Sequence, residues 1–517
     1  MKRVADLLQR EGSVLLLLGG LVLLDRLLLL LAFGFRYVGS DDLILWQGAT
    51  DYAQGIFHEP YFYGQAYNFM LEALLAVPLV AAGVPHHIAL PTITSLLALF
   101  PFFLFARVLY RHEHGPAAAI FLLVPLLLPV EYGILTTIPR GFVTGLFFAG
   151  FLVYPLMEPH RTRSYVILGL ACSFGYVFNP NSLIFALPIA VFLLLRNLKR
   201  PRFYLITALS ACPALLIQEA ARAFYANRPD YNVHFMWTLE FYPSELLPGL
   251  ARLDRYFSHL TPVVWSVGWL FLPALVVISV VIWRKDRSMA AAMLVATLFL
   301  IALLGVNKVN DDAGTLFLSS VRMFLGVPLF FALALSWAVR QGRPPGHHWK
   351  ILVLVLGLCF VPVKAALYGP IAGACAMKAR NGPIAVWPMA ELRTECGRTA
   401  TLLEKHDVDL LMLVPYWDVT VPNMEFYNYG CPLLETSFPT TLMNVYERRT
   451  WVFMREPQAV HPNILIFGRP LDLEPLLCLP GLKFEQLEAN KLLITDNHYP
   501  LKSLLDALRV DLDRNSY

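Results

Sequence analysis

Residues 14–35 read VLLLLGGLVLLDRLLLLLAFGF, and this run is long enough to cross a lipid bilayer as one helix. It leads into RYVGSDD, so two adjacent carboxylates, Asp41 and Asp42, follow the exit of the first span. The basic N-terminus precedes the run without a cleavage site of small residues, so we expect a retained first helix. An acidic pair at a membrane surface can serve as a general base, a metal ligand or a cation site.

The composition of the whole chain agrees with this beginning. Of its 517 residues, 57% are hydrophobic and only 15% are charged, and the net charge is +4. These values predict a polytopic membrane protein. The basic residues are scattered between apolar runs, so nothing in the chain indicates a nucleic-acid partner.

Apolar segments recur along the first 367 residues. We expect eleven spans, near 13–35, 88–106, 116–130, 141–157, 164–178, 182–195, 203–219, 263–283, 288–305, 321–339 and 350–367. A twelfth segment, 69–83, is short, contains Glu72 and is interrupted by Pro78. If it lies along the outer interface, the basic residues of every short connection fall on the side of the N-terminus. This topology places the N-terminus in the cytoplasm, and the acidic loops and the C-terminus outside.

The composition changes after residue 367, where the apolar spans stop. We therefore divide the chain into a transmembrane domain, 1–367, and an extracytoplasmic α/β domain, 368–517. Within the second domain the sequence predicts strands at Leu410–Val414, Trp451–Met454, Ile464–Phe467 and Leu492–Thr495, and helices around Ala400–His406 and Leu501–Leu508.

Four of the seven cysteines fall in this second part of the chain, namely Cys375, Cys396, Cys431 and Cys478. An oxidising compartment would permit up to two disulfide bridges among them. Buried free thiols are an equally weighted alternative.

The first outer loop joins three features in sequence. The acidic pair is followed by the aromatic patch YFYGQAYN at 61–68 and then by the segment from Phe69 that carries Glu72. This arrangement resembles the GT-C superfamily of membrane glycosyltransferases, in particular the branch of the protein O-mannosyltransferases and the lipid A aminoarabinose transferase. Members of that branch have an Asp-Glu or Asp-Asp pair after the first span and a Tyr-Gly-Gln-Pro-Tyr-like stretch. Here alanine, Ala66, replaces the usual proline.

Two further segments resemble the same superfamily more weakly. Arg140-Gly141-Phe142 is similar to an Arg-Gly-Gly-Tyr-type segment at the start of a span. VRMFLGVP at 321–328 is similar to an Arg-Tyr segment with a later proline, although Met323 replaces the tyrosine. The resemblance covers about residues 1–340 in organisation.

The resemblance implies a mainly α-helical fold, with a GT-C-type transmembrane catalytic domain, interfacial helices and a small periplasmic α/β domain. It implies an enzyme that moves a hexose or pentose, with inversion, from a polyprenyl-phosphate-linked donor to an acceptor lipid, polysaccharide or protein. The expected location is the cytoplasmic (inner) membrane of a bacterium, in contact with membrane lipids and with the active site facing the periplasm.

The chemistry of such a transfer limits which residues can carry it. A carboxylate must accept the proton of the acceptor hydroxyl, and cations must stabilise the phosphate leaving group. We expect Asp41 to be the base and Asp42 to orient or bind the acceptor. The candidate phosphate ligands are the outer cations at span ends, Arg140, Lys308 and Arg322. The candidate substrate contacts are Tyr63, Gln65, Tyr67, Glu72 and Glu131.

Other interpretations of these residues stay open. The acidic pair can cap a helix, the cations can anchor in lipid headgroups, and Asp311 and Asp312 fit a solvated loop. Adjacent aspartates without Asp-x-Asp spacing do not favour a dedicated divalent metal, although they are compatible with one.

Three other function classes also remain. They are a transporter of envelope lipid or polysaccharide, a ligase or polymerase that uses the same lipid carriers, and a non-catalytic membrane scaffold. A transporter should hold ionisable groups in the middle of its spans. In the sequence Asp25, Arg26 and Glu219 lie near span ends or isolated, which favours an enzyme.

Overall fold

The protein is described by a computed structural model that covers residues 11–65, 67–228, 231, 239–262, 267–310, 319–341, 348–380, 386–413, 426–435, 438, 441–444, 458–467, 474–477, 479–488 and 490–508. Its contacts divide the chain into two compact units. The first, here called the helical unit, comprises Met1–Phe35, His87–Ala220 and Trp237–Ala379. The second, here called the mixed unit, comprises Arg36–His86, Ala221–Met236 and Arg380–Tyr517.

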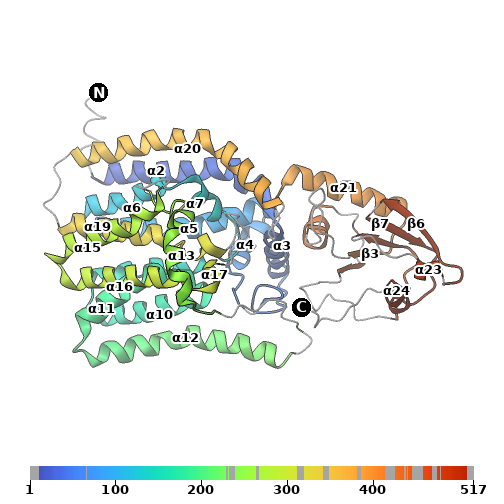
Figure 1. Ribbon diagram of the computed structural model, residues 1–517, viewed down its shortest axis with the longest axis horizontal. Coiled ribbons are helices and arrows are strands. Elements are labelled where there is room, and N and C mark those ends of the chain that lie inside the picture. Colours follow the sequence, from blue (N-terminus) through green and yellow to red (C-terminus); the bar gives the residue numbers. More distant parts are fainter. Residues whose placement is uncertain are drawn as a thin grey trace. The chain divides into compact units, whose positions relative to one another are not determined.

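The helical unit is a bundle of apolar helices (Figure 1). Its longer helices are α2 (Glu11–Leu29), α5 (His86–Arg111), α6 (Gly115–Leu127), α10 (Thr162–Phe178), α11 (Leu183–Asn197), α12 (Pro201–Ala226), α15 (Phe271–Trp283), α16 (Arg287–Leu303), α19 (Val327–Gln341) and α20 (His348–Arg380). Shorter helices lie in the connections, namely α7 (Val130–Leu135), α8 (Thr144–Gly150), α9 (Val153–Met157), α13 (Leu246–Ala251), α14 (Leu253–Phe257), α17 (Asn307–Asn310) and α18 (Ser319–Arg322). Many helices are apolar on every side, which is typical of helices surrounded by lipid. Leu16, for example, is 79% exposed.

Every apolar segment that was expected to span the membrane forms a helix. Within the part of the chain that the structure describes, five helical segments are by themselves long and apolar enough to cross, at Glu11–Gly34, His86–Arg111, Pro180–Asn197, Pro201–Ala226 and His348–Ala379. The other expected spans form shorter helices, so the number of eleven crossings stays a prediction. The segment 69–83 forms α4 (Leu71–Ala81), whose 11 residues extend about 16 Å, roughly half of a hydrocarbon core. Its interfacial position also stays a prediction.

Small residues allow the helices of this unit to approach closely. A Cβ atom on Gly357 of α20 would lie 3.2 Å from side-chain atoms of Leu21 in α2 and Leu126 in α6. A Cβ atom on Gly169 of α10 would lie 2.4 Å from the carbonyl oxygen of Thr207 in α12. Larger side chains at these two glycines would therefore separate the helices.

The mixed unit contains two sheets. β1 (Tyr37–Gly39) pairs antiparallel with β2 (Val386–Pro388), so the residues just before the acidic pair are joined to the C-terminal part of the chain. The larger sheet has the order β4-β3-β5-β7-β6. Its strands are β3 (Leu410–Leu413), β4 (Thr441–Asn444), β5 (Ile464–Phe467), β6 (Lys483–Glu488) and β7 (Lys491–Thr495). β3 is parallel to β4 and β5, whereas β7 is antiparallel to β5 and β6.

The helices of the mixed unit are α3 (Ser40–Ala53), α4, α21 (Met389–Lys405), α22 (Cys431–Leu434), α23 (Glu474–Leu477) and α24 (Leu501–Ala507). Leu504 and Leu505 of α24 belong to one buried cluster with Ile466 of β5 and Ile494 of β7. Both β3 and β5 are apolar and buried along their whole length, as in sheets covered on both faces.

Most of the elements predicted for the C-terminal region are confirmed. The predicted strands at Leu410–Val414, Ile464–Phe467 and Leu492–Thr495 correspond to β3, β5 and β7, and the predicted helices correspond to the end of α21 and to α24. The prediction for Trp451–Met454 lies outside the described residues.

One of the two permitted disulfide bridges is present. Cys396 of α21 is bonded to Cys431 of α22, with a Cα–Cα distance of 5.2 Å. Cys375 is a free thiol in α20, and Cys478 lies outside the described residues. The bridge ties α21 to the segment η5 (Phe426–Gly430), which packs on α3.

The division of the chain into domains 1–367 and 368–517 stays a prediction. Two features of the structure bear on where a boundary lies. Helix α20 continues past residue 367 to Arg380. The first loop, Arg36–His86, belongs to the same compact unit as the C-terminal region.

Candidate functional site

The acidic pair lies in the first turn of α3. Asp42 is buried, and its Oδ2 accepts a hydrogen bond of 2.7 Å from the backbone N–H of Gly39, the N-cap residue. Gly39 has no side chain, and a Cβ there would lie 3.1 Å from the same Oδ2. Asp42 therefore caps the helix, one of the roles considered for the pair. Asp41 is half-buried beside it.

The aromatic patch folds into a closed loop, here called the aromatic hairpin (residues 61–69). Tyr61 and Phe69 form an antiparallel bridge, and the N–H of Phe62 donates to the carbonyl oxygen of Asn68 over 2.8 Å. The turn requires positive φ at Gly64 (77°) and Asn68 (73°), which explains the glycine of the Tyr-Gly-Gln sequence.

Asp51 anchors the predicted substrate residue Tyr63. Its Oδ2 accepts a hydrogen bond of 2.8 Å from the Tyr63 hydroxyl, and its Oδ1 accepts one of 2.8 Å from Gln47. Burial, followed by the negative charge of Asp51, raises the pKa of Tyr63 far above its usual value. Tyr63 is fully buried and thus supports the hairpin from within, which places it less well for direct contact with a substrate.

The other predicted substrate residues of the first loop lie close to Tyr63 in the sequence. Gln65 and Tyr67 are half-buried on the hairpin, whereas Ala66 lies outside the described residues. Glu72 is buried in the first turn of α4, where a carboxylate is favoured by the helix dipole. A Cβ on Gly48 of α3 would lie 3.6 Å from the Cβ of Ala73, so α3 and α4 pack closely.

Sequence reasoning did not single out Glu59, which is only 1% exposed. Its Oε2 accepts a hydrogen bond of 2.7 Å from the hydroxyl of Tyr225, which lies at the end of α12 in the mixed unit. Burial raises the pKa of Glu59 to about 8, although hydrogen bonds from Tyr225 and from the backbone of Gly64 oppose this shift. A run of aromatic residues around an acidic one was the only signal in the sequence.

The helical unit brings two of the predicted phosphate ligands to one place. Asn181 donates from Nδ2 to the carbonyl oxygens of Phe142, over 2.8 Å, and Arg322, over 3.3 Å. The guanidinium of Arg322 lies over the Phe142 ring, 4.6 Å from its centroid. Arg140 is two residues before Phe142 and is 3% exposed. The chain segments of Arg140 and Arg322 thus meet at Asn181, and we call these two arginines, with Phe142 and Asn181, the arginine cluster.

Lys308 lies on a short helix next to this cluster. Its helix, α17, contacts α18, the helix that ends at Arg322. The side chain of Asn307 fixes the start of α17 by accepting from the N–H groups of Lys308, over 2.8 Å, and Glu240, over 3.2 Å. The neighbouring Asp311 and Asp312 lie outside the described residues.

Glu131 lies in the first turn of α7, and it faces a histidine. Its Oε1 is 3.8 Å from Nδ1 of His259. Burial lowers the pKa of His259, while the negative charge of Glu131 opposes that shift. At neutral pH this histidine is therefore mostly uncharged, and the pair is a weak ion pair at most.

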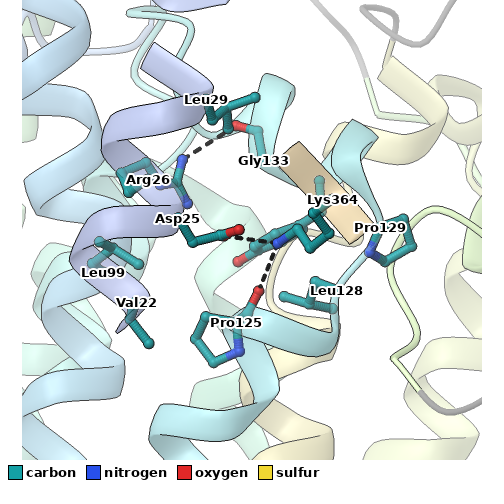
Figure 2. Close-up of a pocket in the computed structure, with 11 residues that line it drawn as sticks. Val22, Asp25, Arg26, Leu29, Leu99, Pro125, Leu128, Pro129, Gly133 and Lys364 are labelled. Atoms are coloured by element: carbon teal, nitrogen blue, oxygen red, sulfur yellow. Dashed lines mark hydrogen bonds and ion pairs between the residues drawn. The ribbon is translucent and has the colours of Figure 1, made fainter. Parts of the chain in front are cut away.

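A group of buried charges lies within the helices themselves (Figure 2). The Nζ of Lys364 is 2.8 Å from Oδ2 of Asp25 and donates to the carbonyl oxygen of Pro125 over 3.2 Å. Arg26 donates to Thr136 Oγ1 over 3.0 Å and to the carbonyl oxygen of Gly133. A small pocket is lined by Asp25, Arg26, Pro125, Gly133 and Lys364, among others. Asp25, which was expected to lie near a span end or isolated, therefore has an ion partner, Lys364 of α20.

Among the residues that the structure describes, no group of three or more His, Cys, Asp or Glu side chains is arranged to hold a metal ion. The two sets of candidate residues fall into different units. Asp41, Asp42, Tyr63, Gln65, Tyr67 and Glu72 belong to the mixed unit, and Arg140, Lys308, Arg322 and Glu131 belong to the helical unit.

Comparisons of sequence and of structure relate this chain to known proteins. The family model described as dolichyl-phosphate-mannose-protein mannosyltransferase matches residues 83–217. The chain is also similar to the crystal structure of ArnT from Cupriavidus metallidurans in the apo state, with a TM-score of 0.55, 13% identity, and coverage of 94% of this chain and 98% of that one. For the same protein bound to undecaprenyl phosphate, the TM-score is 0.51 at 11% identity, with 92% and 97% covered. No curated protein matches the sequence.

The structural similarity confirms the predicted fold, a GT-C-type helical membrane domain with a small C-terminal sheet region. The family match over residues 83–217 agrees with the prediction of a membrane glycosyltransferase.

Proposed function

We propose that this integral membrane glycosyltransferase of GT-C fold moves a sugar, with inversion, from a polyprenyl-phosphate-linked donor to an acceptor outside the cytoplasm. The observation that carries the proposal is the arginine cluster, in which Asn181 joins the segments of Arg140 and Arg322. Two guanidinium-bearing segments held together at the ends of membrane helices suit a phosphate group on a membrane lipid.

In this proposal the arginine cluster holds the donor phosphate. Arg322 is held over Phe142, so its guanidinium loses little conformational entropy when it binds an anion. Lys308, on the helix that contacts α18, adds a third positive charge. The ArnT structure described as bound to undecaprenyl phosphate supports this class of donor.

Asp41 is the proposed general base. It accepts the proton of the acceptor hydroxyl while the hydroxyl oxygen bonds to the anomeric carbon, and the bond from that carbon to the phosphate oxygen breaks. The electron pair leaves with the polyprenyl phosphate, whose negative charge the arginine cluster stabilises. A positioned base contributes about 10² to 10⁴ in rate.

The acceptor is proposed to meet residues of the first loop and of α7. Gln65, Tyr67 and Glu72 offer hydrogen-bonding groups on the aromatic hairpin and α4, and Glu131 offers a carboxylate. The chemistry fits a hydroxyl or amine on a lipid, a polysaccharide or a protein.

We place the protein in the cytoplasmic membrane of a bacterium, with the mixed unit facing the periplasm. The bridge between Cys396 and Cys431 supports this orientation, because disulfides persist in oxidising compartments. His112, exposed between α5 and α6, should then face the cytoplasm, and Gln54, exposed after α3, should face outward. An impermeant thiol reagent applied to intact cells should label Gln54→Cys and leave His112→Cys unlabelled; the reverse pattern would invert the topology.

The transfer reaction tests the proposal directly. Washed membranes are supplied with an undecaprenyl-phosphate-linked radiolabelled sugar, and the label that moves to lipid, polysaccharide or protein is measured. Asp41→Asn should lower transfer at least about 10²-fold while donor binding is retained. Asp506→Asn, an exposed position in α24, is the matched control and should leave transfer unchanged. Equal transfer by Asp41→Asn and the wild type would refute the mechanism.

A transporter is the second candidate, because Asp25 and Lys364 place charges inside the membrane helices. A transporter would move the donor lipid across sealed vesicles without breaking the bond between sugar and phosphate. Recovery of intact donor on the opposite side, with no labelled acceptor, would favour it.

A further inference from the structure

The aromatic hairpin is bonded to a distant helix end through a buried carboxyl group. The hydroxyl of Tyr225 donates to Oε2 of Glu59 over 2.7 Å, and the N–H of Tyr61 donates to the oxygen of the same hydroxyl over 3.3 Å. Glu59 precedes the hairpin by two residues, whereas Tyr225 lies 166 positions further along the chain. The Tyr225 hydroxyl therefore binds both Glu59, which precedes the hairpin, and Tyr61, its first residue.

Ring stacking strengthens the same connection. The rings of Tyr61 and Tyr225 are stacked, with 5.7 Å between centroids and 4° between planes, and the ring of Phe69 lies 4.8 Å from that of Tyr61. Aromatic pairs of this kind contribute about 0.5–1.5 kcal/mol beyond their buried area. Tyr61 and Phe69 are the two ends of the hairpin. Tyr225 therefore packs at the point where the loop closes.

Burial favours the neutral form of Glu59, and its effect exceeds that of the hydrogen bonds from Tyr225 and Gly64, which favour the ionised form. Tyr225 faces it from α12, Tyr63 from the hairpin, and Asp51 and Tyr52 from α3, with His58 adjacent in sequence. Burial raises the pKa of Glu59 to about 8, so at pH 7 most molecules carry a carboxylic acid. Its Oε1 is buried and has no hydrogen-bond partner among the described residues, which is tolerable for an acid and costly for a carboxylate.

We propose that Glu59 is a positioning residue, whose neutral carboxyl and Tyr225 together lock the aromatic hairpin in place, and whose ionisation opens this lock. Burial penalises the ionised carboxylate by more than its hydrogen bonds from Tyr225 and Gly64 stabilise it, so the ionised group moves toward water. The hydrogen bond to Tyr225 and the stacked end of the hairpin then separate. The inference rests on the proposed function only in its consequence for activity, because Gln65 and Tyr67, the proposed acceptor contacts, lie on this hairpin.

The lock has a defined dependence on pH. The native pKa of Glu59 is raised from 4.5 to about 8, so the folded state keeps a proton that the unfolded state releases. The stability that this group contributes is thus fully present below pH 4.5 and is lost as the pH rises to about 8. Between these two values the opening equilibrium should grow about tenfold per pH unit, and above pH 8 it should level off, because the group is then ionised in both states.

Hydrogen exchange of the purified full-length protein in detergent tests the lock without any substrate. Protection of the N–H groups of Tyr61 and Phe62, corrected for intrinsic exchange, should fall about tenfold between pH 6 and pH 7 in the wild type and level off above pH 8. Glu59→Gln keeps a neutral acceptor and should retain protection without this pH dependence. Tyr225→Phe removes the hydrogen bond and should lower protection at every pH.

Glu485→Gln, at an exposed position in β6, is the matched control and should behave as the wild type. The same pH dependence in Glu59→Gln as in the wild type, or none in the wild type, would overturn the lock. If Glu59→Gln does not fold, the comparison of the wild type with Tyr225→Phe still decides.

The consequence for activity separates the two proposals. With the undecaprenyl-phosphate-linked sugar as donor, kcat/KM for transfer should fall as the pH rises from 6 to 8 in the wild type and stay level in Glu59→Gln. Loss of exchange protection without any detectable transfer would reject the proposed function and keep the lock. Detectable transfer together with exchange protection that does not depend on pH would reject the lock and keep the proposed function.

Discussion

The backbone N–H of Gly39 donates to Oδ2 of Asp42 over 2.7 Å, and this hydrogen bond closes the first turn of α3. Neighbouring carboxylates of the same helix turn can therefore have different tasks. Asp42 completes the backbone hydrogen bonding of the helix start, where N–H groups lack intrahelical acceptors. Asp41 is the residue of the pair that we propose as the base.

Removal of the cap should cost stability. Asp42→Ala deletes the acceptor for the Gly39 N–H, so we expect the free energy of unfolding to fall by about 1 kcal/mol. Asp42→Asn keeps an oxygen acceptor and should lose less. Thermal unfolding in detergent measures both, with Asp506→Asn as the reference for an exposed aspartate. A stability of Asp42→Ala equal to that of the wild type would show that the cap contributes nothing.

Arg322 should matter for the donor phosphate. Arg322→Ala should weaken donor binding by about 1.5–3 kcal/mol, the magnitude of a hydrogen bond to a charged group. Arg322→Lys should restore only part of this loss, because lysine lacks the planar fork that binds two phosphate oxygens. Binding of undecaprenyl phosphate to the purified protein gives the measurement.

The control for this comparison is Arg284→Ala, at an exposed position between α15 and α16. It removes the same charge from the protein and should leave binding unchanged. If Arg322→Ala bound the lipid as tightly as Arg284→Ala, Arg322 would be a headgroup anchor and no phosphate ligand.

The buried pair of Asp25 and Lys364 should behave as a unit. Lys364→Met leaves the Asp25 carboxylate buried without its ion partner, and Asp25→Asn leaves the ammonium group in the same position. Each single change should cost about 3–5 kcal/mol, and the double change should cost less than the sum of the two. Unfolding in detergent gives all three values. Additive losses would mean that the two groups do not interact.

The disulfide should stabilise the mixed unit. Its cysteines are 35 residues apart, for which the loop-entropy relation gives about 3–4 kcal/mol. Cys396→Ser with Cys431→Ser should therefore unfold at lower temperature than the wild type, whereas Cys375→Ser should not. A reducing agent should lower the melting temperature only of those proteins that keep the bridge. An unchanged melting temperature in the double variant would mean that the bridge constrains the unfolded chain little.

The sequence was sufficient for features that depend on nearby residues. Long apolar runs such as Val14–Phe35 specify membrane helices locally, since a helix satisfies its own backbone hydrogen bonds. β3, β5 and β7 were predicted from short apolar runs rich in Leu and Ile. The acidic pair and the Tyr-Gly-Gln stretch were found because they are contiguous.

Contacts between distant residues could not be predicted in the same way. Lys364 is one charge in a long apolar helix, and its partner Asp25 lies 339 positions away. The same holds for Asn181, whose side chain joins Phe142 to Arg322, and for Glu59 with Tyr225. The choice of Cys396 with Cys431 was open as well, since four cysteines allow three pairings.

The pairing of β1 with β2 has a consequence for how the protein is made. Val38 faces Trp387 across this two-stranded sheet, and the N–H of Met389 donates to the carbonyl oxygen of Arg36 over 2.8 Å. Domains generally fold as the chain emerges from the ribosome. The strand that precedes Asp41 must nevertheless wait until almost four hundred residues have been synthesised before its partner exists. A nascent chain that stops after α20 would hold the described helices of the helical unit and still lack the partner strand of β1. The strand that leads into the acidic pair can therefore be paired only when most of the polypeptide has been synthesised.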